Sequence, residues 1–520
     1  MKKVLLISYE NDGKTIYRVS EALRCKGHEV LIVDGSISTA TRFHQLPVSS
    51  YRGLEEPIAK FMDKLKNKKL TINPSIELRY IEKEYISCRK NLRQLIRTAP
   101  YYYDDHHTRR PYYNIGTDHL RLCYVLELIK WFIDIIRDFN PDLVFCFQGN
   151  YFIKQLAASI SLKFNYRYIS LNPSRIRDFM MVLDHRFLPC NSYSNSAPSN
   201  DDYIKADQIL AEASLDLASF TYSGFFKLSL KNLKNKNFKI EAFIHLLSLP
   251  FWLASEILFI LKLNLIIFLK HRKKITFNLF NFSLKLSLMH KAITTIRKCL
   301  IFWKYEKYFC SFADIQFLKN RKIRIVYLAL HVLPESSTLC FSNNYYEDDL
   351  IRYISSRLPV DCILVIKENV QMLGDRPLSF YENINKLGNA YLIDPMLLSK
   401  QLLGISDAIV GLTGTIMLEA KVFGIELISA LGTPEFIEVL PQELKDYEGL
   451  DYMLKCLNTA FKPSFSSLKL NNYIAEVIAL NIRWDHEMTS HVFHGHPLDK
   501  RRCGIIINDV SKLISTVLSP

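Results

Sequence analysis

The first part of the chain alternates between short apolar runs and segments with helical spacing of apolar residues. The run "KKVLLISYE" is typical of a buried strand, and "HEVLIVDG" is a second one. Between them, "NDGKTIYRVSEALRCKG" places Ile16, Val19 and Leu23 on one helical face and ends at Gly27. A strand, a helix and a strand in this order predict a βαβ unit in a parallel sheet.

The same alternation returns further along the chain. After residues 40–115, where we expect a helix-rich insertion of polar and aromatic character, "PDLVFCFQG" and "YRYISLNP" are predicted strands. A second alternating region begins at "RKIRIVYLAL" and continues through "CILVIKEN", "NAYLIDP", "AIVGLTG" and "IELISALG". These strands are continuous apolar runs, as expected for a parallel sheet covered by helices on both faces.

The pattern therefore predicts an α/β protein with two doubly wound, Rossmann-like domains whose strand ends face one cleft. A chain of 520 residues with 49% apolar content is too long for one core and suits two domains of ~150–220 residues. We predict an N-terminal domain in 1–189, a linker with a basic, apolar helical segment in 190–320, a C-terminal domain in 321–440 and a helical tail in 441–520.

The number and spacing of the cysteines, and the first residues of the chain, indicate the cellular compartment of the protein. The eleven cysteines are scattered, odd in number and never spaced as C-x-x-C, which argues against a disulfide framework or a zinc knuckle. The start "MKKVLLISYENDGK" has an apolar run too short for a signal peptide, and acidic residues follow it at once. We expect a cytoplasmic protein with reduced thiols.

The formal net charge of +15 is concentrated in one segment. Between Lys227 and Lys298 the chain has fourteen Lys and Arg residues but only two acidic ones, Glu241 and Glu256, so this segment carries +12. The rest of the chain is nearly balanced. No aromatic and basic repeat accompanies the charge, which argues against nucleic acid as the partner.

The basic segment encloses an apolar stretch, residues 242–269. A membrane-spanning helix needs ~20 residues almost free of charge, whereas this stretch contains His245, Pro250, Glu256 and Lys262. An apolar body with cationic flanks suits a helix lying on an anionic membrane surface. A buried helix pair between the domains and a true span are the alternatives.

Polar side chains follow several predicted strands of the second domain. In "LHVLPESST", His331 and Glu335 follow the first of them, where an imidazole near its ordinary pKa could donate to a phosphate and a carboxylate could hold a sugar hydroxyl. "CILVIKEN" ends in Lys367 and Glu368, suited to phosphate and to sugar hydroxyls respectively. A strand cap, a helix start and a surface ion pair are the structural alternatives.

The stretch "AIVGLTGTIMLEAKVFG" is the most specific of these. A strand runs into Thr413, Gly414 and Thr415, and a helix begins at once with Glu419 one turn inside. Glycine permits close backbone approach, and N–H groups with Thr hydroxyls favour an anionic group. The stretch lacks the Gly-Lys-Ser/Thr ending of a P-loop, and a structural tight turn is the alternative. Strand ends of one parallel sheet meet at one edge, so all three stretches together predict a site.

These stretches resemble the successive motifs of the bacterial capsule polysaccharide biosynthesis family, which includes 3-deoxy-manno-octulosonic acid (Kdo) transferases. The family reads L-H-x-x-P-E, K-E-H-P, G-x-R and G-T-x-x-x-E-A, and the resemblance covers about residues 321–435. It implies a GT-B architecture and glycosyl transfer from a nucleotide sugar, with CMP-Kdo as the leading donor. The donor-site residues that it implies are His331, Glu335, Lys367, Glu368, Thr413, Gly414, Thr415 and Glu419, and we predict Asn369 beside them as a further donor-binding residue.

One position departs from the family pattern. Asn369 and Val370 stand where the family has His-Pro, and asparagine donates a hydrogen bond but carries no positive charge. The departure implies altered donor handling or lost activity. A non-catalytic polysaccharide assembly or binding protein with a degenerate site, and a nucleotide-sugar epimerase of the same architecture, therefore stay open as alternatives.

We expect the N-terminal domain to hold the acceptor and the catalytic base. Glu10 and Asp12 follow the first strand, where a carboxylate could take a proton from an acceptor hydroxyl, although Asp12 could instead cap the next helix. Gln148 and Asn150 follow a later strand. The tract "YYYDDHHTRRPYY" (101–113) could stack sugars or be a solvated loop.

The overall prediction is a cytoplasmic glycosyltransferase, peripheral on the inner face of the cytoplasmic membrane, that acts on a capsule or surface-polysaccharide precursor. Its expected partners are a nucleotide sugar, a glycan or lipid-linked acceptor and an anionic membrane surface, without nucleic acid. We expect no metal and no cofactor besides the donor substrate. The histidines of "HEMTSHVFHGHP" lack the carboxylate or cysteine pattern of a metal site.

Overall fold

The computed structural model describes most of the predicted core of both domains, and every structural statement below concerns the residues it describes. These are residues 1–8, 12–35, 51–86, 118–148, 152–190, 197–215, 292–331, 347–432, 436–459, 469–479 and 500–518, apart from a few single positions, with scattered positions in 243–258.

The N-terminal domain is built on a sheet with the strand order β3-β2-β1-β4-β5-β6. The strands from β3 to β5 pair in parallel, and β6 is antiparallel to β5. The strand bounds are β1 Lys3–Ser8, β2 Glu29–Asp34, β3 Tyr51–Gly53, β4 Leu143–Phe147, β5 Arg167–Pro173 and β6 Met180–Leu183. Edge strand β3 lies in the region that the sequence predicts as a helix-rich insertion, and β6 was not predicted.

The C-terminal domain contains a fully parallel sheet with the order β11-β10-β7-β8-β9. The strand bounds are β7 Arg324–Ala329, β8 Cys362–Lys367, β9 Ala390–Ile393, β10 Ala408–Gly411 and β11 Leu427–Ala430. In each sheet, the first strand in the chain lies in the middle. The next strands are added on one side of it, and the later strands on the other side. The prediction of two doubly wound, Rossmann-like domains is confirmed.

Helices connect and cover these strands. Their bounds are α1 Gly13–Cys25, α2 Glu55–Lys66, α3 Pro74–Tyr85, α5 Asp118–Phe139, α6 Phe152–Ile160, α7 Asn200–Leu215, α12 Tyr305–Tyr308, α13 Phe312–Asn320, α15 Glu347–Ser355, α16 Leu378–Asn385, α17 Ser399–Leu403, α18 Ile416–Val422, α19 Asp446–Asn458, α20 Leu470–Ala479 and α22 Lys500–Leu518. In α1 the predicted apolar face, Ile16, Val19 and Leu23, is fully buried. In the described part of the chain, no helix has the length and apolarity needed to cross a bilayer.

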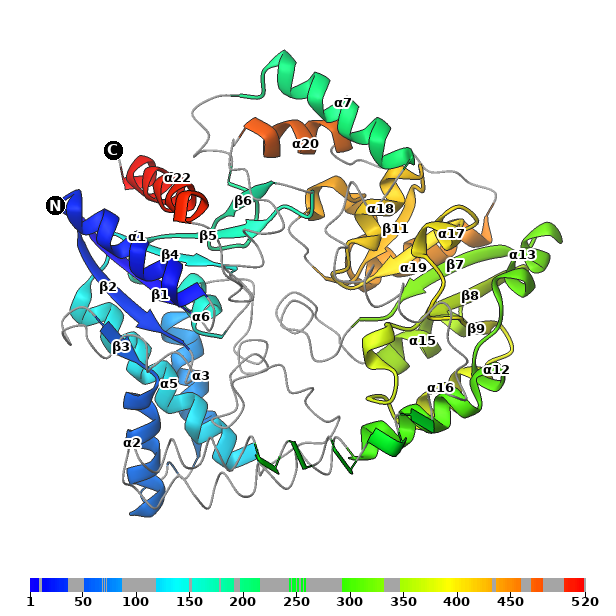
Figure 1. Cartoon of the computed structure of the whole chain (residues 1–520), viewed down its shortest axis with the longest axis horizontal. Coiled ribbons are helices and arrows are strands. Elements are labelled where there is room, and N and C mark those ends of the chain that lie inside the picture. The colour runs from blue at the N-terminus through cyan, green and yellow to red at the C-terminus, as the bar shows by residue number, and fades with distance from the viewer. Residues whose placement is uncertain are drawn as a thin grey trace.

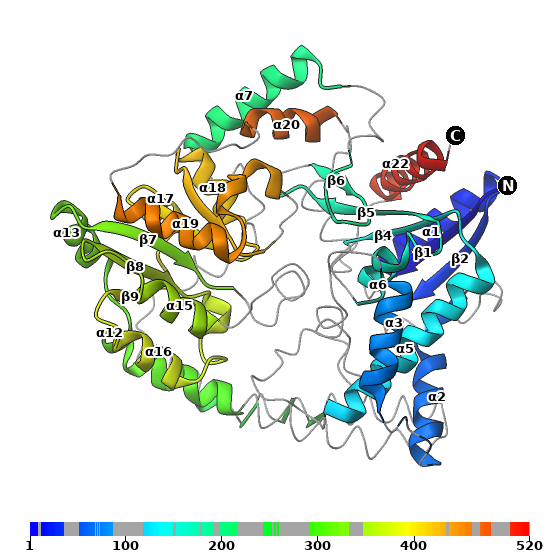
Figure 2. The same ribbon diagram turned by 180° about the vertical axis from the view of Figure 1, so that it is seen from behind.

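The reversal of strand order fixes where each sheet offers a binding edge. It falls between β1 and β4 in the first sheet and between β7 and β10 in the second. In Figures 1 and 2, β1 and β7 start on the outer sides of their domains and lead toward the middle of the molecule. The carboxyl ends of both sheets, where open α/β sheets bind their ligands, therefore point toward each other.

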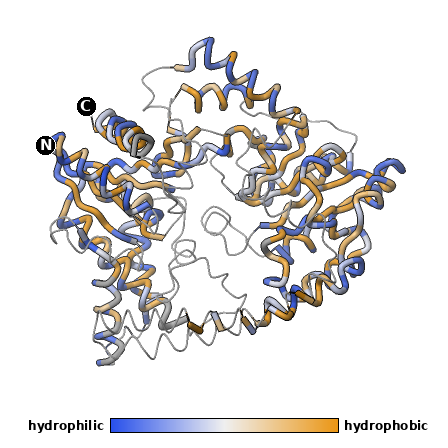
Figure 3. The backbone as a smooth tube through the Cα atoms, viewed as in Figure 1, coloured by the Kyte–Doolittle hydropathy of each residue, from blue (hydrophilic) through white to orange (hydrophobic). Residues whose placement is uncertain are grey.

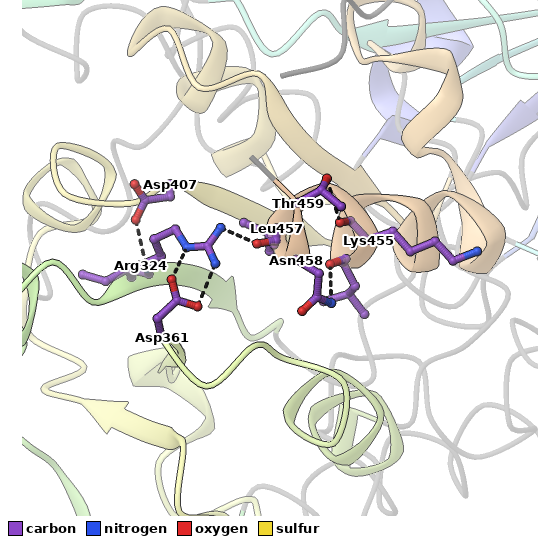
Figure 4. Close-up of polar contacts among 9 residues, drawn as sticks. Arg324, Asp361, Asp407, Lys455, Leu457, Asn458 and Thr459 are labelled. Carbon is purple, nitrogen blue, oxygen red and sulfur yellow. Dashed lines mark hydrogen bonds and ion pairs between the residues drawn. The ribbon is translucent and has the colours of Figure 1, made fainter. Parts of the chain in front are cut away.

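The amino edge of the second sheet is closed by ion pairs (Figure 4). The Arg324 guanidinium binds both carboxylate oxygens of Asp361 at 2.7 and 3.0 Å and donates to the carbonyl of Leu457 at the end of α19. Asp407, just before β10, accepts the backbone N–H of Ile325 at 2.7 Å and the ammonium of Lys319 at 2.6 Å. Arg324 and Asp407 at this edge are thus paired within the protein.

The last helix returns to the N-terminal domain. Figures 1 and 2 show α22 beside α1, although nearly the whole chain separates them in sequence. Val510 and Ile514 of α22 share a buried cluster with Val4 and Leu6 of β1. Lys26 also donates to the carbonyl of Ser511, and Arg167 to that of Val517. The predicted tail therefore includes part of the N-terminal core.

A pair of helices, α7 and α20, joins the two domains on one side (top of Figure 1). Tyr473 of α20 donates its hydroxyl hydrogen to the carbonyl of Ser174 at 2.9 Å, next to β5 of the first sheet. Helix α7 contacts both α20 and α18 of the second domain. The chain thus crosses between the domains with packed helices at this side.

Replacing Ile514 with alanine tests whether α22 belongs to the N-terminal core. Ile514 is fully buried, so removing its side chain should lower the free energy of unfolding by about 2–5 kcal/mol. The control is Lys512→Ala on the exposed face of the same helix. Chemical denaturation followed by circular dichroism measures both, and equal stability of the two variants would contradict the packing of α22.

Candidate functional site

Three neighbouring strands of the second sheet carry the predicted site residues at their carboxyl ends. His331 follows β7 by two residues, Lys367 is the last residue of β8, and Thr413 to Thr415 connect β10 to α18. The strands β8, β7 and β10 are adjacent, with the reversal of strand order between β7 and β10. The three stretches therefore meet at one edge, where ligands bind in this type of sheet.

His331 packs directly against the turn after β10. Its Nε2 accepts the backbone N–H of Thr413 at 3.3 Å, across the point of strand reversal. A Cβ on Gly414 would lie 3.1 Å from the same nitrogen, so a side chain at this position would crowd the imidazole. Glycine thus allows the close approach of the turn to His331.

His331 is a neutral positioning residue in this arrangement. Burial, together with the nearby Arg376 guanidinium, lowers the pKa of His331 to about 4. Because Nε2 accepts a hydrogen bond, the proton of the neutral ring belongs on Nδ1. The expectation that His331 has an ordinary pKa is wrong because the side chain is buried, whereas its contact with a phosphate stays a prediction.

The side chain of Arg376 connects the ends of β7 and β8. Its fully buried guanidinium lies 2.5 Å from Glu347 and 2.7 Å from Glu368, and it donates to the carbonyl of His331 at 2.9 Å. Glu347 in turn accepts the backbone N–H of His331 at 2.8 Å. One cation therefore holds both backbone groups of His331, directly or through Glu347. We call Arg376, Glu347 and Glu368 the buried charge cluster.

Glu368 belongs to this cluster and is not exposed to a ligand. One carboxylate oxygen accepts the backbone N–H of Asn369 at 2.7 Å, and the other accepts the Tyr381 hydroxyl at 3.0 Å. The side chain is completely buried. A carboxylate that is completely buried is not accessible to a sugar hydroxyl, and among the described residues Glu368 pairs with Arg376 and not with Lys367. Glu368 therefore supports the site from within.

The buried charge cluster contains two carboxylates for one guanidinium. Burial raises the pKa of Glu347 to about 7, while Arg376 acts in the opposite direction. Burial likewise raises the pKa of Glu368, opposed by Arg376 and by two hydrogen bonds. Paired and hydrogen-bonded charges of this kind are costly to break one at a time, because removal of one partner leaves another charge buried without compensation.

Lys367 differs from the buried charge cluster because its charge has no partner among the described residues. No hydrogen bond or ion pair connects its ammonium to any of them, and the side chain is only partly buried. Burial lowers the pKa of Lys367 to about 8, and the charges of Asp394, Glu368 and Glu419 oppose this effect. At pH 7 the ammonium is therefore mostly charged and suited to an anionic ligand.

The turn after β10 provides the other accessible groups. Gly414 and Thr415 are partly exposed, whereas Thr413 and Glu419 are buried beneath them. Thr415 Oγ1 donates to a carboxylate oxygen of Glu419 at 3.4 Å. The edge thus has an accessible layer, consisting of Lys367, Asn369, Gly414 and Thr415, over a buried layer that holds it in place.

The N-terminal sheet has a buried ion pair at its own point of strand reversal. Lys154 of α6 lies 3.0 Å from Asp12 and also donates to the carbonyl of Phe147, and both charged side chains are almost fully buried. Asp12 makes no capping hydrogen bond to α1. Gln148, at the end of β4, adopts a positive φ of 44°. Asp12 is therefore positioned near the carboxyl ends of β1 and β4, with its charge paired.

Several predicted residues lie outside the described part of the chain. These are Glu10, Asn150, Glu335, the tract 101–113 and the histidines 486, 491, 494 and 496. Among the described residues, no group of three or more His, Cys, Asp or Glu side chains could hold a metal ion.

Glu347, Arg376, Tyr381 and Asp394 lie at or near the site but were not predicted from the sequence. Arg376 lies in "GDRPLSF", where the G-x-R motif was the available signal. Gly374 has a φ of 91°, and a Cβ there would come within 2.5 Å of the Thr294 carbonyl oxygen. Glycine is required at this turn, which packs against the helical residues 292–303 and leads to Arg376.

A cavity of about 290 Å³ lies away from these strand ends. Its lining includes Leu210 of α7, Val422 of α18 and Leu470 of α20. Val422 is the last residue of α18, whereas the turn at Thr415 precedes its first. The cavity therefore belongs to the junction of the helix pair and not to the candidate site.

Comparisons with known proteins give distant structural matches only. No protein-family model and no curated protein sequence matches the chain. The beta Kdo 2,7 transferase KpsC of Thermosulfurimonas dismutans matches 32% of this chain and 51% of its own at 15% identity and a TM-score of 0.22. UDP-GlcNAc 2-epimerase from Methanocaldococcus jannaschii matches 92% and 98% at 9% identity and a TM-score of 0.23.

A third match is Anabaena Alr3699/HepE in complex with UDP, which covers 99% of this chain and 100% of its own at 9% identity and a TM-score of 0.24. The chain spans about half the length of the Kdo transferase that it matches. At these identities and TM-scores, the matches do not bear on the roles of individual residues. Those roles are argued from the geometry of the chain itself.

Replacing Arg376 with methionine tests the buried charge cluster. The variant leaves two carboxylates buried without a counter-charge, so the free energy of unfolding should fall by about 3–5 kcal/mol. Arg357→Met is the matched control, because the partly exposed Arg357 lies 3.7 Å from Asp451 and its loss should cost about 0–1 kcal/mol. Similar denaturation midpoints for the two variants would refute a supporting role for Arg376.

The lowered pKa of His331 predicts a particular pH dependence of stability. His331 takes up a proton near pH 6.5 in the unfolded chain but only near pH 4 in the folded chain. The free energy of unfolding therefore falls as the pH drops from 6.5 to 4. The loss approaches about 1.4 kcal/mol per pH unit. A His331→Gln variant keeps a hydrogen-bond acceptor but does not titrate.

Chemical denaturation of both proteins across this pH range measures the effect. The wild-type protein should lose stability relative to His331→Gln as the pH falls. Glu347 titrates in both proteins, and its raised pKa favours the folded state at lower pH, so only the difference between the two curves reports on His331. Parallel curves would show that the imidazole is not held neutral.

Proposed function

We propose that the protein is a glycosyltransferase that binds a nucleotide-sugar donor at the carboxyl edge of its second sheet. The observation that carries the proposal is the accessible layer at this edge: the charged Lys367, which makes no hydrogen bond or ion pair with the described residues, beside the partly exposed turn at Gly414 and Thr415. At the opposite edge, Arg324 and Asp407 are paired within the protein. An ammonium that is accessible at the edge where ligands bind can contact an anionic ligand.

CMP-Kdo is the donor that we propose, on the strength of the motif resemblance. It carries a phosphate and a sugar carboxylate, so a point charge such as Lys367 would find an anionic partner in either group. The hydroxyl of Thr415 and the open backbone at Gly414 would contact the phosphate or the sugar. Glu368 and His331 would act indirectly, by fixing the positions of Asn369 and of the turn.

Asn369 bears directly on the activity of such a site. Its backbone N–H is bound by Glu368, which fixes the residue beside Lys367 at the end of β8. The asparagine side chain can donate a hydrogen bond to a donor phosphate but adds no charge. Lys367 would then be the main cationic contact of the donor, and donor affinity should depend strongly on it.

The proposed reaction transfers the sugar to an acceptor hydroxyl. The hydroxyl oxygen forms a bond to the anomeric carbon, the bond from that carbon to the phosphate oxygen breaks, and CMP leaves with the electron pair. A carboxylate of the N-terminal domain takes the hydroxyl proton. Glu10 and Asp12 stay the predicted bases, and Asp12 would have to leave its ion pair with Lys154 to accept this proton.

The proposed acceptor is a glycan or lipid-linked precursor of a capsule or surface polysaccharide. The protein would then act in the cytoplasm, as a peripheral protein on the anionic inner face of the membrane. The basic composition of residues 227–298 supports this location, because cationic segments are attracted to anionic lipid.

Titration calorimetry with CMP and UDP tests the donor site. CMP should bind the wild-type protein, and Lys367→Met should weaken CMP binding roughly 10- to 100-fold, because it removes a hydrogen bond to a charged group. Lys386→Met is the control, since the exposed Lys386 precedes β9 at the opposite edge of the sheet. Equal CMP affinity of the two variants would refute donor binding at this edge.

The same titrations discriminate the alternatives. A preference for UDP would disfavour Kdo transfer and favour a UDP-sugar enzyme such as an epimerase. Absence of binding to both nucleotides would favour a non-catalytic polysaccharide assembly partner. In that case the buried layer would be the remnant of a site whose accessible layer no longer binds a donor.

A further inference from the structure

An apolar helix face lies open to solvent within the basic segment. The described residues among 243–258 are helical, and they include seven large apolar side chains that are 42–81% exposed. These side chains are Phe243, Ile244, Leu246, Leu247, Phe251, Ile257 and Leu258. Phe251 is the most exposed of them, at 81%. We call this set the apolar face.

The apolar face follows helical spacing. Phe243, Leu247, Phe251 and Leu258 recur at intervals that bring residues onto one side of an α-helix, which turns about 100° per residue. In Figure 3 the coloured positions of this segment include strongly hydrophobic ones. Figures 1 and 2 place the segment at the edge of the molecule, between the ends of the two domains that lie opposite the α7 and α20 pair. The segment thus lies at one border of the protein.

The sequence around the apolar face carries a strong positive charge. Lys231, Lys234, Lys236 and Lys239 precede it, and "KHRKK" follows at 270–274. An exposed apolar stripe suits the acyl region of a bilayer, and clustered Lys and Arg suit its anionic headgroups. A protein partner would need a complementary apolar groove with acidic borders, whereas an anionic bilayer provides both features at any point of its surface.

We propose that the described helical residues within 243–258 dock flat on an anionic lipid bilayer, with the apolar face in the interface and the positive charge of the surrounding sequence attracted to the headgroups. This inference deepens the proposed function, since it names the surface that would hold the enzyme beside a lipid-linked acceptor. Docking itself depends only on the apolar face and the charge. It can therefore be tested independently of donor binding.

The test is flotation of the full-length protein with lipid vesicles. The protein should float with vesicles of phosphatidylcholine and phosphatidylglycerol, and much less with phosphatidylcholine alone, because the basic residues need an anionic surface. Raised salt should lower binding to the mixed vesicles. Failure of the wild-type protein to float with the mixed vesicles would overturn the proposal.

Two variants test whether the protein docks through the apolar face. A Leu247→Glu, Phe251→Glu double variant should lower the bound fraction about tenfold or more, because charge on the apolar face opposes insertion. The control is Leu215→Glu, which changes an equally exposed apolar residue, 80% exposed, at the end of α7. Equal binding of the double variant and the control would refute docking through this face.

Two further measurements separate docking from other outcomes. Circular dichroism and CMP titration of the double variant should match the wild-type protein, so that loss of flotation reports on the surface and not on the fold or the donor site. Sedimentation without lipid should show the same oligomeric state for both proteins. If the wild-type protein is an oligomer and the double variant is a monomer, the proposal is overturned, and the apolar face binds a second copy of the chain.

Discussion

A fully buried guanidinium between two carboxylates holds the candidate site together. Arg376 reaches the strand ends of β7 and β8 at once, because it binds the carbonyl of His331 and the carboxylate of Glu368. His331 then accepts the N–H of Thr413 across the point where the strand order reverses. The positions of the accessible groups therefore depend on a charge that no ligand touches. Such an arrangement fixes a site without using the groups that must bind the ligand.

The two edges of the second sheet differ in how their charges are matched. At the amino edge, Arg324 and Asp407 find partners within the protein. At the carboxyl edge, one guanidinium pairs with two carboxylates in the buried layer, and Lys367 in the accessible layer makes no hydrogen bond or ion pair with the described residues. The N-terminal sheet has a buried ion pair, Lys154 with Asp12, at its own reversal. The lysine at the end of β8 is thus accessible to a ligand, whereas the buried Lys154 is held by Asp12.

Apolar periodicity predicted both sheets because strands buried on both faces and their covering helices leave strong local patterns. Polar residues after these strands predicted where the candidate site lies, because the carboxyl ends of parallel strands meet at one edge of the sheet. The buried charge cluster was harder to predict, since Glu347 begins an acidic run, "EDD", that is equally typical of the first turn of a helix. Its pairing with Arg376 depends on tertiary packing. The return of α22 to the first sheet was likewise not predictable, because amphipathic spacing does not say which domain a helix covers.

Binding of the proposed nucleotide-sugar donor at the carboxyl edge of the second sheet can be measured by hydrogen exchange of the full-length protein with and without CMP-Kdo. Exchange should slow in two stretches that are distant in sequence, residues 362–370 at the end of β8 and residues 411–419 around the turn after β10. Unchanged exchange in both stretches, with CMP-Kdo bound and protection elsewhere in the chain, would contradict donor binding at this edge.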